Sequence, residues 1–300
     1  MRLLITGADG QVGWELRRSL LPLGEVMALD RRACDLSRPQ DLPRILREAR
    51  PDIIVNAAAY TAVDKVEEEE PLATLINGTA VGVIAEEARK LDALLIHYST
   101  DYVFDGTKTA PYTEDDPPHP LNAYGRSKLA GERAIEQCGG GYLILRTSWV
   151  YAARGRNFLL TVLRLARERD ELRIVADQIG APTWAREIAD ATASIAIQAR
   201  REAGQGGFKS GIFNVTAADQ TSWFGFARAI LDQAAQSPGL LRYKPKLCPI
   251  ATADYPVPAE RPRNSCLAGY LVRERFGIAM ADWQHMLMRC MEDTALLETT

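Results

Sequence analysis

The first half of the chain alternates short apolar runs with longer segments whose apolar residues recur every three or four positions. Runs of the first kind are bounded by turn residues, as buried parallel strands are, and they are Leu3–Thr6, Glu25–Leu29, Ile53–Asn56, Ala93–Ser99 and Tyr142–Thr147. Segments of the second kind carry charge on one face, as helices on a sheet do, and they are Val12–Leu21, Asp41–Arg50, Thr79–Lys90 and Ala123–Gln137. This alternation predicts an α/β fold with a doubly wound parallel sheet.

The pattern loosens after about Trp149. Four helical segments alternate there with single strands and with proline-rich loops such as Tyr255–Arg263; the helical segments are Asn157–Arg169, Ala185–Arg200, Trp223–Ala235 and Asp282–Leu297. We expect a Rossmann-like domain over residues 1–149, to which 184–201 return, and a smaller α/β substrate-binding domain over 150–300. Gly204–Gly211 is predicted to be a surface loop.

Composition narrows the class of protein. The 300 residues are 47% hydrophobic and 25% charged with a net charge of −3, which argues against nucleic-acid binding or a membrane-surface role because both need a basic surface. We find no long apolar span and no signal-peptide pattern, and the five scattered cysteines suit reduced thiols, so we expect a cytoplasmic protein. The acidic run Glu67–Glu70 is interpreted as a solvated helix entry.

A glycine loop follows the first predicted strand and opens the first predicted helix. Gly7, Gly10 and Gly13 have the spacing that holds a dinucleotide diphosphate on backbone amides. Asp30 ends the second strand, where a carboxylate can accept hydrogen bonds from the adenosine ribose, which favours NAD. The arginines that follow it, Arg31 and Arg32, would instead suit a 2′-phosphate, so the choice between NADH and NADPH stays open.

Two further segments are expected beside the cofactor. Cys34-Asp35-Leu36 would lie near the adenine, and the small residues of Asn56–Thr61 follow the strand at the centre of the sheet. Small side chains there would let the nicotinamide half lie against the backbone.

Tyr124 and Lys128 are the strongest candidates for chemistry. They are four residues apart, so a helix places both on one face. Reduction of a ketone leaves an alkoxide, which a phenol can protonate if a nearby ammonium lowers its pKa. Thr100, just past the fourth strand, would complete the grip on the carbonyl. His97 is expected to be a packed core residue, and no histidine has the spacing of a triad or metal site.

Seven stretches of the sequence resemble the extended short-chain dehydrogenase/reductase superfamily and, within it, the dTDP-4-dehydrorhamnose reductases. They are Gly10–Leu16, Val55–Lys65, His97–Phe104, Pro120–Glu132, Arg146–Tyr151, Asp177–Thr183 and Arg261–Ser265. The resemblance implies reduction of the 4-keto group of dTDP-4-dehydro-L-rhamnose, a small nucleotide sugar, by NADPH or NADH.

The resemblance also implies roles for individual residues. Thr100, Tyr124 and Lys128 match the catalytic trio, and Thr100, Asp101 and Trp149 match substrate positions. The matching cofactor positions are Gly10, Gln11, Val12, Asp30, Asp35, Leu36, Ala59, Tyr60 and Thr61. From its place after a strand, Trp149 would either offer a flat face to the substrate or pack between domains. Arg261 and Arg263 would suit a diphosphate or thymine.

Some members of that family resemble Mg²⁺-linked homodimers in which acidic residues of two subunits meet. The best matches here are Glu15, Glu187 and Glu292, with Asp293 as an alternative to the last. The resemblance therefore implies a homodimer and a metal, Mg²⁺, as further expectations.

Two other functions remain open. One is a sugar-nucleotide dehydratase or epimerase, although Asp101-Tyr102 follows Thr100 where dehydratases carry Asp-Glu. The other is a cofactor-binding regulatory subunit similar to the partner of methionine adenosyltransferase, a role that needs no working acid.

Overall fold

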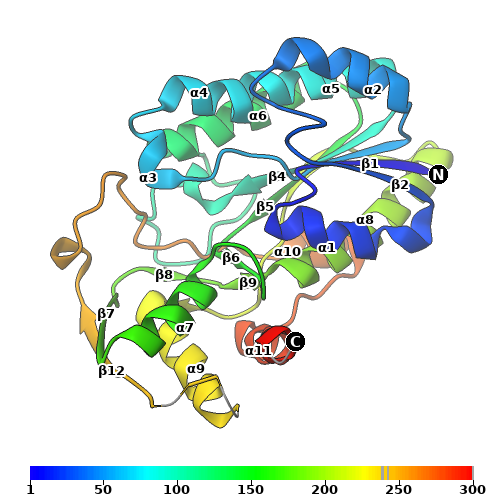
Figure 1. Ribbon diagram of the computed structural model, residues 1–300. Helices are drawn as coiled ribbons and strands as arrows, with labels where there is room; N and C mark the ends of the chain where they lie inside the picture. The colour runs from blue at the N-terminus through cyan, green and yellow to red at the C-terminus, as the bar shows by residue number, and fades with distance from the viewer. Residues whose placement is uncertain (238–239, 242, 299–300) are drawn as a thin grey trace.

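Six parallel strands form the centre of the molecule in the order β10-β5-β4-β3-β1-β2 (Figure 1). The computed structural model describes residues 1–237, 240, 241 and 243–298. The strands are β1 (Arg2–Thr6), β2 (Glu25–Leu29), β3 (Ile53–Asn56), β4 (Leu94–Thr100), β5 (Tyr142–Thr147) and β10 (Gly211–Asn214). The predicted α/β fold is confirmed, and of the six strands of this sheet the sequence analysis missed the edge strand β10.

Helices cover both faces of this sheet (Figure 1). One face carries α2 (Leu42–Ala49), α5 (Ala80–Lys90) and α6 (Ala123–Cys138), with α3 (Val63–Val66) and α4 (Glu70–Thr74) beside α6. The other face carries α1 (Gln11–Ser19), α8 (Ala185–Gly204) and α10 (Tyr270–Phe276). Alternate strand residues separate the two layers: Leu3 and Ile5 pack with α1 and α8, whereas Leu4 packs with α2 and α5.

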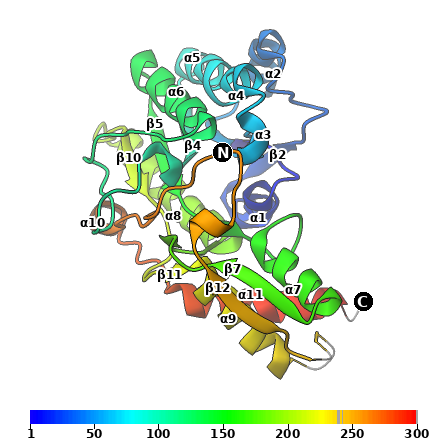
Figure 2. The same cartoon turned by 90° about the vertical axis from the view of Figure 1, so that its left-hand side faces the viewer.

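A second group of elements has a core of its own, which lies below the sheet in Figure 2. Helices α7 (Phe158–Glu168), α9 (Trp223–Gln236) and α11 (Trp283–Glu298) accompany the parallel pair β7 (Glu171–Val175) and β12 (Lys246–Ile250). Two short pairs join in: β6 (Val150–Tyr151) with β9 (Thr183–Trp184), and β8 (Ile179–Gly180) with β11 (Thr221–Ser222).

The segments of the two cores are interleaved along the chain. After the chain leaves the sheet at β5, α8, β10 and α10 return to the first core. The division into a Rossmann domain and a substrate domain remains an interpretation of these two cores. No helix in the described part of the chain is long and apolar enough to cross a bilayer.

The carboxyl ends of the parallel strands meet at one edge of the sheet. From β1 the chain runs outward to β2 and then crosses to β3 on the other side of β1. A doubly wound sheet binds its ligands at such a switch point, beyond the carboxyl ends of the strands. Here the residues that end the strands around this point are Thr6, Asn56 and Thr100.

Candidate active site

The N-terminus of α6 is fixed by its capping residue. The side-chain oxygen of Asn122 accepts a hydrogen bond from the backbone N of Gly125 at 2.8 Å, and its Nδ2 donates to the carbonyl of Glu260 at 2.7 Å. Tyr124 and Lys128 lie in the first two turns, on one face of the helix. The cap therefore sets the position of the two predicted catalytic side chains.

The side chain of Thr100 lies close enough to the hydroxyl of Tyr124 to influence its pKa, so the structure brings these two predicted residues together. The phenol ring also meets the ring of Tyr102 edge-to-face, with centroids 5.6 Å apart. Burial and the nearby carboxylate of Asp101 raise the pKa of Tyr124, and the nearby hydroxyl of Thr100 opposes them only in part. This direction is opposite to the one expected from the sequence, in which Lys128 lowers the pKa of the phenol.

The direction of the Lys128 side chain accounts for this difference between the expected and the observed pKa shift of Tyr124. Its Nζ donates to the carbonyl oxygen of Tyr98 at 2.7 Å and lies 3.2 Å from Nε2 of His97. The side chain is 2% exposed, and burial lowers the pKa of Lys128 to about 8, against the opposing charge of Glu132. The ammonium is thus held toward β4, and it does not contribute to the pKa shift of Tyr124 in this structure.

Thr100 and Asp101 form the wall opposite Tyr124. Thr100 Oγ1 donates to Oδ1 of Asp101 at 2.9 Å and accepts from the backbone N of Tyr102 at 3.2 Å. Asp101 is 3% exposed, and burial raises its pKa to about 6, while the hydroxyls of Ser265, Thr100 and Ser148 limit the rise. The carboxyl group of Asp101 therefore titrates near neutral pH beside the phenol.

The glycine loop packs so closely on neighbouring backbone that side chains could not be accommodated at Gly7 and Gly13. Gly7 has φ +69°, and a Cβ on it would lie 2.7 Å from the backbone of Ala58. A Cβ on Gly13 would overlap the carbonyl oxygen of Gly7. Gly10 begins α1 without a side-chain cap, so the first-turn amides of Gln11–Gly13 lack intrahelical acceptors and can face an anion. The loop fits the diphosphate of a nicotinamide cofactor.

The predicted adenosine side of the cleft lies after β2. Oδ1 of Asp30 accepts from the backbone N of Arg32 at 3.0 Å and of Ala33 at 2.9 Å, so a ribose hydroxyl would have to bind Oδ2. The side chain of Arg31 is 79% exposed and lies 3.8 Å from Asp35. A carboxylate and an exposed guanidinium are thus both available to the ribose.

Two more predicted cofactor residues, Asp35 and Leu36, lie further along the loop that follows β2. Oδ1 of Asp35 accepts from the backbone N and the Oγ of Ser37, at 3.0 and 2.8 Å. Leu36 is 4% exposed and packs in the core beneath α2. The side chain of Leu36 is therefore a wall of this loop rather than a polar contact.

The loop Ala59-Tyr60-Thr61 is tied to the catalytic helix by Asn77, which the sequence analysis missed. Oδ1 of Asn77 accepts from Tyr60 N at 2.8 Å, and its Nδ2 donates to Tyr60 O and to Oγ of Ser127, both at 3.0 Å. Ser127 Oγ in turn donates to the carbonyl of Tyr124 at 2.8 Å. Asn77 lies in a π-helical segment, Leu75–Thr79, and such segments are frequent at functional sites. In the sequence, the feature that could have indicated it is an Asn-Gly pair inside a helical run.

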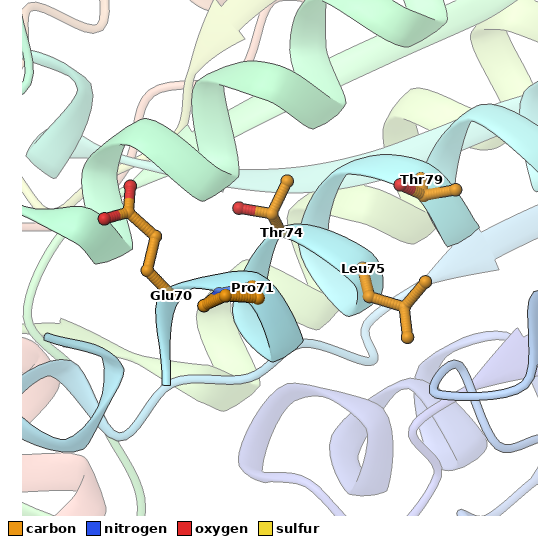
Figure 3. A pocket seen from close by; sticks show the side chains of 5 residues that line it. All are labelled: Glu70, Pro71, Thr74, Leu75 and Thr79. Carbon is orange, nitrogen blue, oxygen red and sulfur yellow. The ribbon is translucent and has the colours of Figure 1, made fainter. Parts of the chain in front are cut away.

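The acidic run Glu67–Glu70 does more than face solvent, so that interpretation is wrong in part. Glu67 accepts from the backbone N of Ala123, the first residue of α6, at 2.8 Å. Glu70 accepts two hydrogen bonds from Arg126, each at 2.8 Å, and Figure 3 shows its carboxylate directed toward α6. The run therefore anchors the start of the catalytic helix, where negative charge suits the helix dipole.

A cavity of about 620 Å³ opens between the two cores, with Tyr102, Arg261 and Trp223 in its wall. Because Tyr102 also contacts Tyr124, the cavity adjoins the candidate acid. Arg261 pairs with Asp64 at 2.8 Å. The size of the cavity and its mixture of polar and apolar lining residues suit a ligand of nucleotide size.

Trp149 stacks on Trp223, with ring centroids 3.5 Å apart and planes 7° apart. Its φ of +46° and the close approach of its ring to Gly180 fix this orientation. One face of the indole is thus used in packing, and its contact with a substrate stays a prediction.

The predicted metal residues do not gather into a metal site within the described residues of one chain, and their meeting across two subunits stays a prediction. Glu15 pairs with Arg186 at 3.0 Å, and Glu292 with Arg289 at 3.3 Å. Arg186 also pairs with Asp293 at 2.6 Å. Within the described residues there is no group of three or more His, Cys, Asp or Glu side chains able to hold a metal, Glu187 included. Three of these carboxylates, Glu15, Glu292 and Asp293, are paired with arginines, and the Mg²⁺ expectation is not supported.

A doubly wound parallel sheet, a glycine cradle at its switch point and a Tyr-x-x-x-Lys helix beside it define a Rossmann-type oxidoreductase. A family model described as the RmlD substrate binding domain matches residues 1–296. The chain belongs to this family, which includes the dTDP-4-dehydrorhamnose reductases.

Relatives and solved structures agree with that assignment. The chain is 54% identical over 294 residues to a dTDP-4-dehydrorhamnose reductase of Burkholderia thailandensis, covering 98% of this chain and 99% of the relative. It is 44% identical over 297 residues to that of Escherichia coli K12, covering 98% of each. A crystal structure of dTDP-4-dehydrorhamnose reductase from Bacillus anthracis in complex with NADP superposes with a TM-score of 0.87 at 34% identity, over 98% of this chain and 99% of that one.

Proposed function

We propose that this protein reduces the 4-keto group of dTDP-4-dehydro-L-rhamnose to give dTDP-L-rhamnose, with NADPH or NADH as the reductant. The relatives that carry this name match the chain over nearly its full length. The structure with NADP supports a nicotinamide cofactor. The motifs outside the cofactor fold, such as Asp177–Thr183 and Arg261–Ser265, support the substrate class.

One observation carries the proposal: Thr100, at the end of β4, and Tyr124, in the first turn of α6, bring their side chains together, and Tyr102 beside them lines the cavity. Buried hydroxyls of Ser99 and Thr147 nearby have no hydrogen-bond partner within the described residues. Buried polar groups normally have partners, so this edge of the sheet suits a polar ligand such as a sugar.

The keto oxygen of the substrate would accept hydrogen bonds from Thr100 Oγ1 and Tyr124 Oη. The bound cofactor supplies the hydride that reduces the carbonyl carbon. The proton on Tyr124 Oη then moves to the alkoxide oxygen, leaving a phenolate. Because its pKa is raised, Tyr124 is fully protonated at neutral pH, and an alkoxide is basic enough to take its proton.

Other groups of the site have holding roles in this proposal. Asp101 would accept hydrogen bonds from sugar hydroxyls, and Lys128 would hold the nicotinamide ribose. Gly7, Gly10, Gln11 and Val12 would bind the diphosphate through their backbone.

The residues after β2 suit the adenosine ribose of either nicotinamide cofactor. Asp30 would bind the ribose hydroxyls of NADH, and the exposed Arg31 would bind the 2′-phosphate of NADPH. We therefore propose that the protein uses either one. The ratio of kcat/KM for the two cofactors measures the balance.

The two alternatives are less well supported. A dehydratase needs a second carboxylate after the threonine, and Tyr102 stands there after Asp101. A regulatory subunit needs no acid, yet Thr100 and Tyr124 are paired as a reductase would use them. The homodimer stays a prediction, which light scattering of the purified protein tests.

The experiment is the loss of near-ultraviolet absorbance of NADPH or NADH on mixing purified protein with dTDP-4-dehydro-L-rhamnose. We expect loss that depends on substrate and is unaffected by a chelator. If the absorbance does not fall in the presence of substrate, the reductase proposal is wrong.

A further inference from the structure

A line of four buried polar side chains ends at Lys128. Oγ1 of Thr6 donates to Oδ1 of Asn56 at 2.6 Å, and Nδ2 of Asn56 lies 2.9 Å from Nδ1 of His97. Nε2 of His97 lies 3.2 Å from Nζ of Lys128. The line thus runs from β1 through β3 and β4 to the catalytic helix.

All four side chains lie in the interior. Thr6 and His97 are 0% exposed, Asn56 is 1% exposed and Lys128 is 2% exposed. Burying an unpaired polar group costs about 1–3 kcal/mol, so a chain that fills this position only for packing would place an apolar residue there. The imidazole of His97 instead has a polar partner on each ring nitrogen.

His97 is neutral in this environment. Burial, followed by the charge of Lys128, lowers the pKa of His97 well below its usual value. A neutral imidazole has one N–H and one lone pair, and an ammonium can only donate. Nε2 therefore accepts from Lys128, and Nδ1 carries the ring proton. This requires the amide of Asn56 to turn its oxygen to Nδ1–H and its nitrogen to Oγ1 of Thr6, which then accepts, so that Oδ1 and Nδ2 of Asn56 exchange the places given above.

We propose that His97 is a positioning residue of this reductase: its Nε2 and the carbonyl of Tyr98 together fix the Lys128 side chain at the cofactor end of the site. The role rests on the proposed function, because Lys128 matters there as the group that holds the ribose. His97 itself would touch neither substrate nor cofactor.

The other groups around Lys128 do not replace this contact. Glu132, one turn further along α6, favours the charged form of Lys128. However, both carboxylate oxygens of Glu132 are bonded to Arg146, at 2.9 and 2.7 Å. Tyr124 is an uncharged phenol, because burial and the charge of Asp101 raise its pKa. His97 is thus the titratable side chain in direct contact with the ammonium nitrogen.

The first test uses two substitutions and a matched control. His97→Leu removes the acceptor, whereas His97→Gln keeps a polar atom near the position of Nε2. Thr192→Val, in α8 on the other face of the sheet, removes a comparable buried hydrogen bond, the 2.6 Å contact with the hydroxyl of Tyr98. The readouts are kcat and KM for NADPH from roughly pH 6 to pH 10.

We expect His97→Leu to lower kcat/KM for NADPH by roughly ten- to a hundredfold, because misplacement of the Lys128 ammonium should lower the rate by about that factor. Without its acceptor the ammonium is less stable, so the alkaline limb of the profile should move about one unit to lower pH. His97→Gln should recover most of both losses, and Thr192→Val should leave the profile in place. An unmoved limb in a folded His97→Leu protein would overturn the proposal.

The second test does not depend on activity, so it separates this inference from the proposed reaction. The chain has 3 histidines, and their ring nitrogens can be followed by ¹⁵N NMR. We expect His97 to stay neutral through the pH range in which an unperturbed imidazole titrates, and we expect Lys128→Met to shift the Nε2 resonance of His97. Titration of His97 near its usual pKa, or no response to Lys128→Met, would contradict the contact even if the enzyme is active.

Discussion

Tyr124 is held as a protonated phenol by its surroundings. Burial and the carboxylate of Asp101 both raise its pKa. The residue is therefore a proton donor over the whole physiological range, and its conjugate base must be stabilised by groups that arrive with the ligands.

Tyr124→Phe removes the proton donor and little else. We expect turnover to fall by about a hundred- to ten-thousandfold, the usual worth of a general acid. Binding of NADPH, followed by the fluorescence of the reduced nicotinamide, should change little, because the ring and its contact with Tyr102 remain. Turnover near that of the wild type would mean that another group supplies the proton.

Asp101 links pH to stability. Its pKa in the folded protein is about 6, above the value of 3.8 in a model compound, so the fold favours the protonated form. Ionisation of Asp101 therefore does not change the free energy of unfolding below about pH 4. It lowers that free energy progressively as the pH rises to about 6, and by a constant amount above that.

Asp101→Asn removes this cost. We expect it to raise the unfolding free energy at pH 8 by about 1–3 kcal/mol and to give no gain at pH 4. Activity should fall, because the carboxylate is a proposed substrate contact. Thermal melts of both proteins at the two pH values check the prediction, and an equal gain at both would show that the charge is not the cause.

Helix α6 is the element on which the site depends, and it packs closely against the π-helical segment Leu75–Thr79. A Cβ on Gly131 would overlap the carbonyl oxygen of Asn77 in the π-helical segment. Glycine at this position is what allows α6 to approach that segment closely.

Gly131→Ala should therefore destabilise the protein by about 1–3 kcal/mol through overpacking. It should also raise the KM for NADPH, because Asn77 holds the loop at Tyr60. Gly204→Ala in α8 is the matched control: a Cβ there meets nothing within 4 Å, so we expect a gain of about 0.5–1 kcal/mol. Chemical denaturation measures both, and equal effects would contradict the packing argument.

The sequence predicts regular elements better than their contacts. The five strands and the helices between them were predictable because their hydrophobic periods are clear. β10 was missed because Gly211–Asn214 is short and follows a glycine-rich loop. Thr100 and Tyr124 were recognisable from motifs, but the stack of Trp149 on Trp223 and the bond of Asn77 to Tyr60 join distant positions, which no local pattern records.

Across the whole molecule, a buried ion pair connects α6 to the sheet. Arg146 on β5 and Glu132 on α6 are each 1% exposed and share two hydrogen bonds. The pair joins the catalytic helix to the strand whose end lies beside Thr100.

Glu132→Gln would leave the guanidinium of Arg146 buried without its counter-ion. We expect a loss of about 3–5 kcal/mol in unfolding free energy. The exposed pair Arg44–Glu48 is the control, and Glu48→Gln should cost less than about 1 kcal/mol. Equal losses in urea denaturation would show that burial of the pair is not what matters.

The most direct measurement of the central claim follows the hydrogen itself. The purified protein is given dTDP-4-dehydro-L-rhamnose and a reduced cofactor deuterated at the transferring position of the nicotinamide, and the product is examined by NMR. We predict deuterium at carbon four of the sugar from the wild-type protein and little transfer from Tyr124→Phe over the same time. A sugar without deuterium at carbon four, or transfer by Tyr124→Phe at the wild-type rate, would contradict the account.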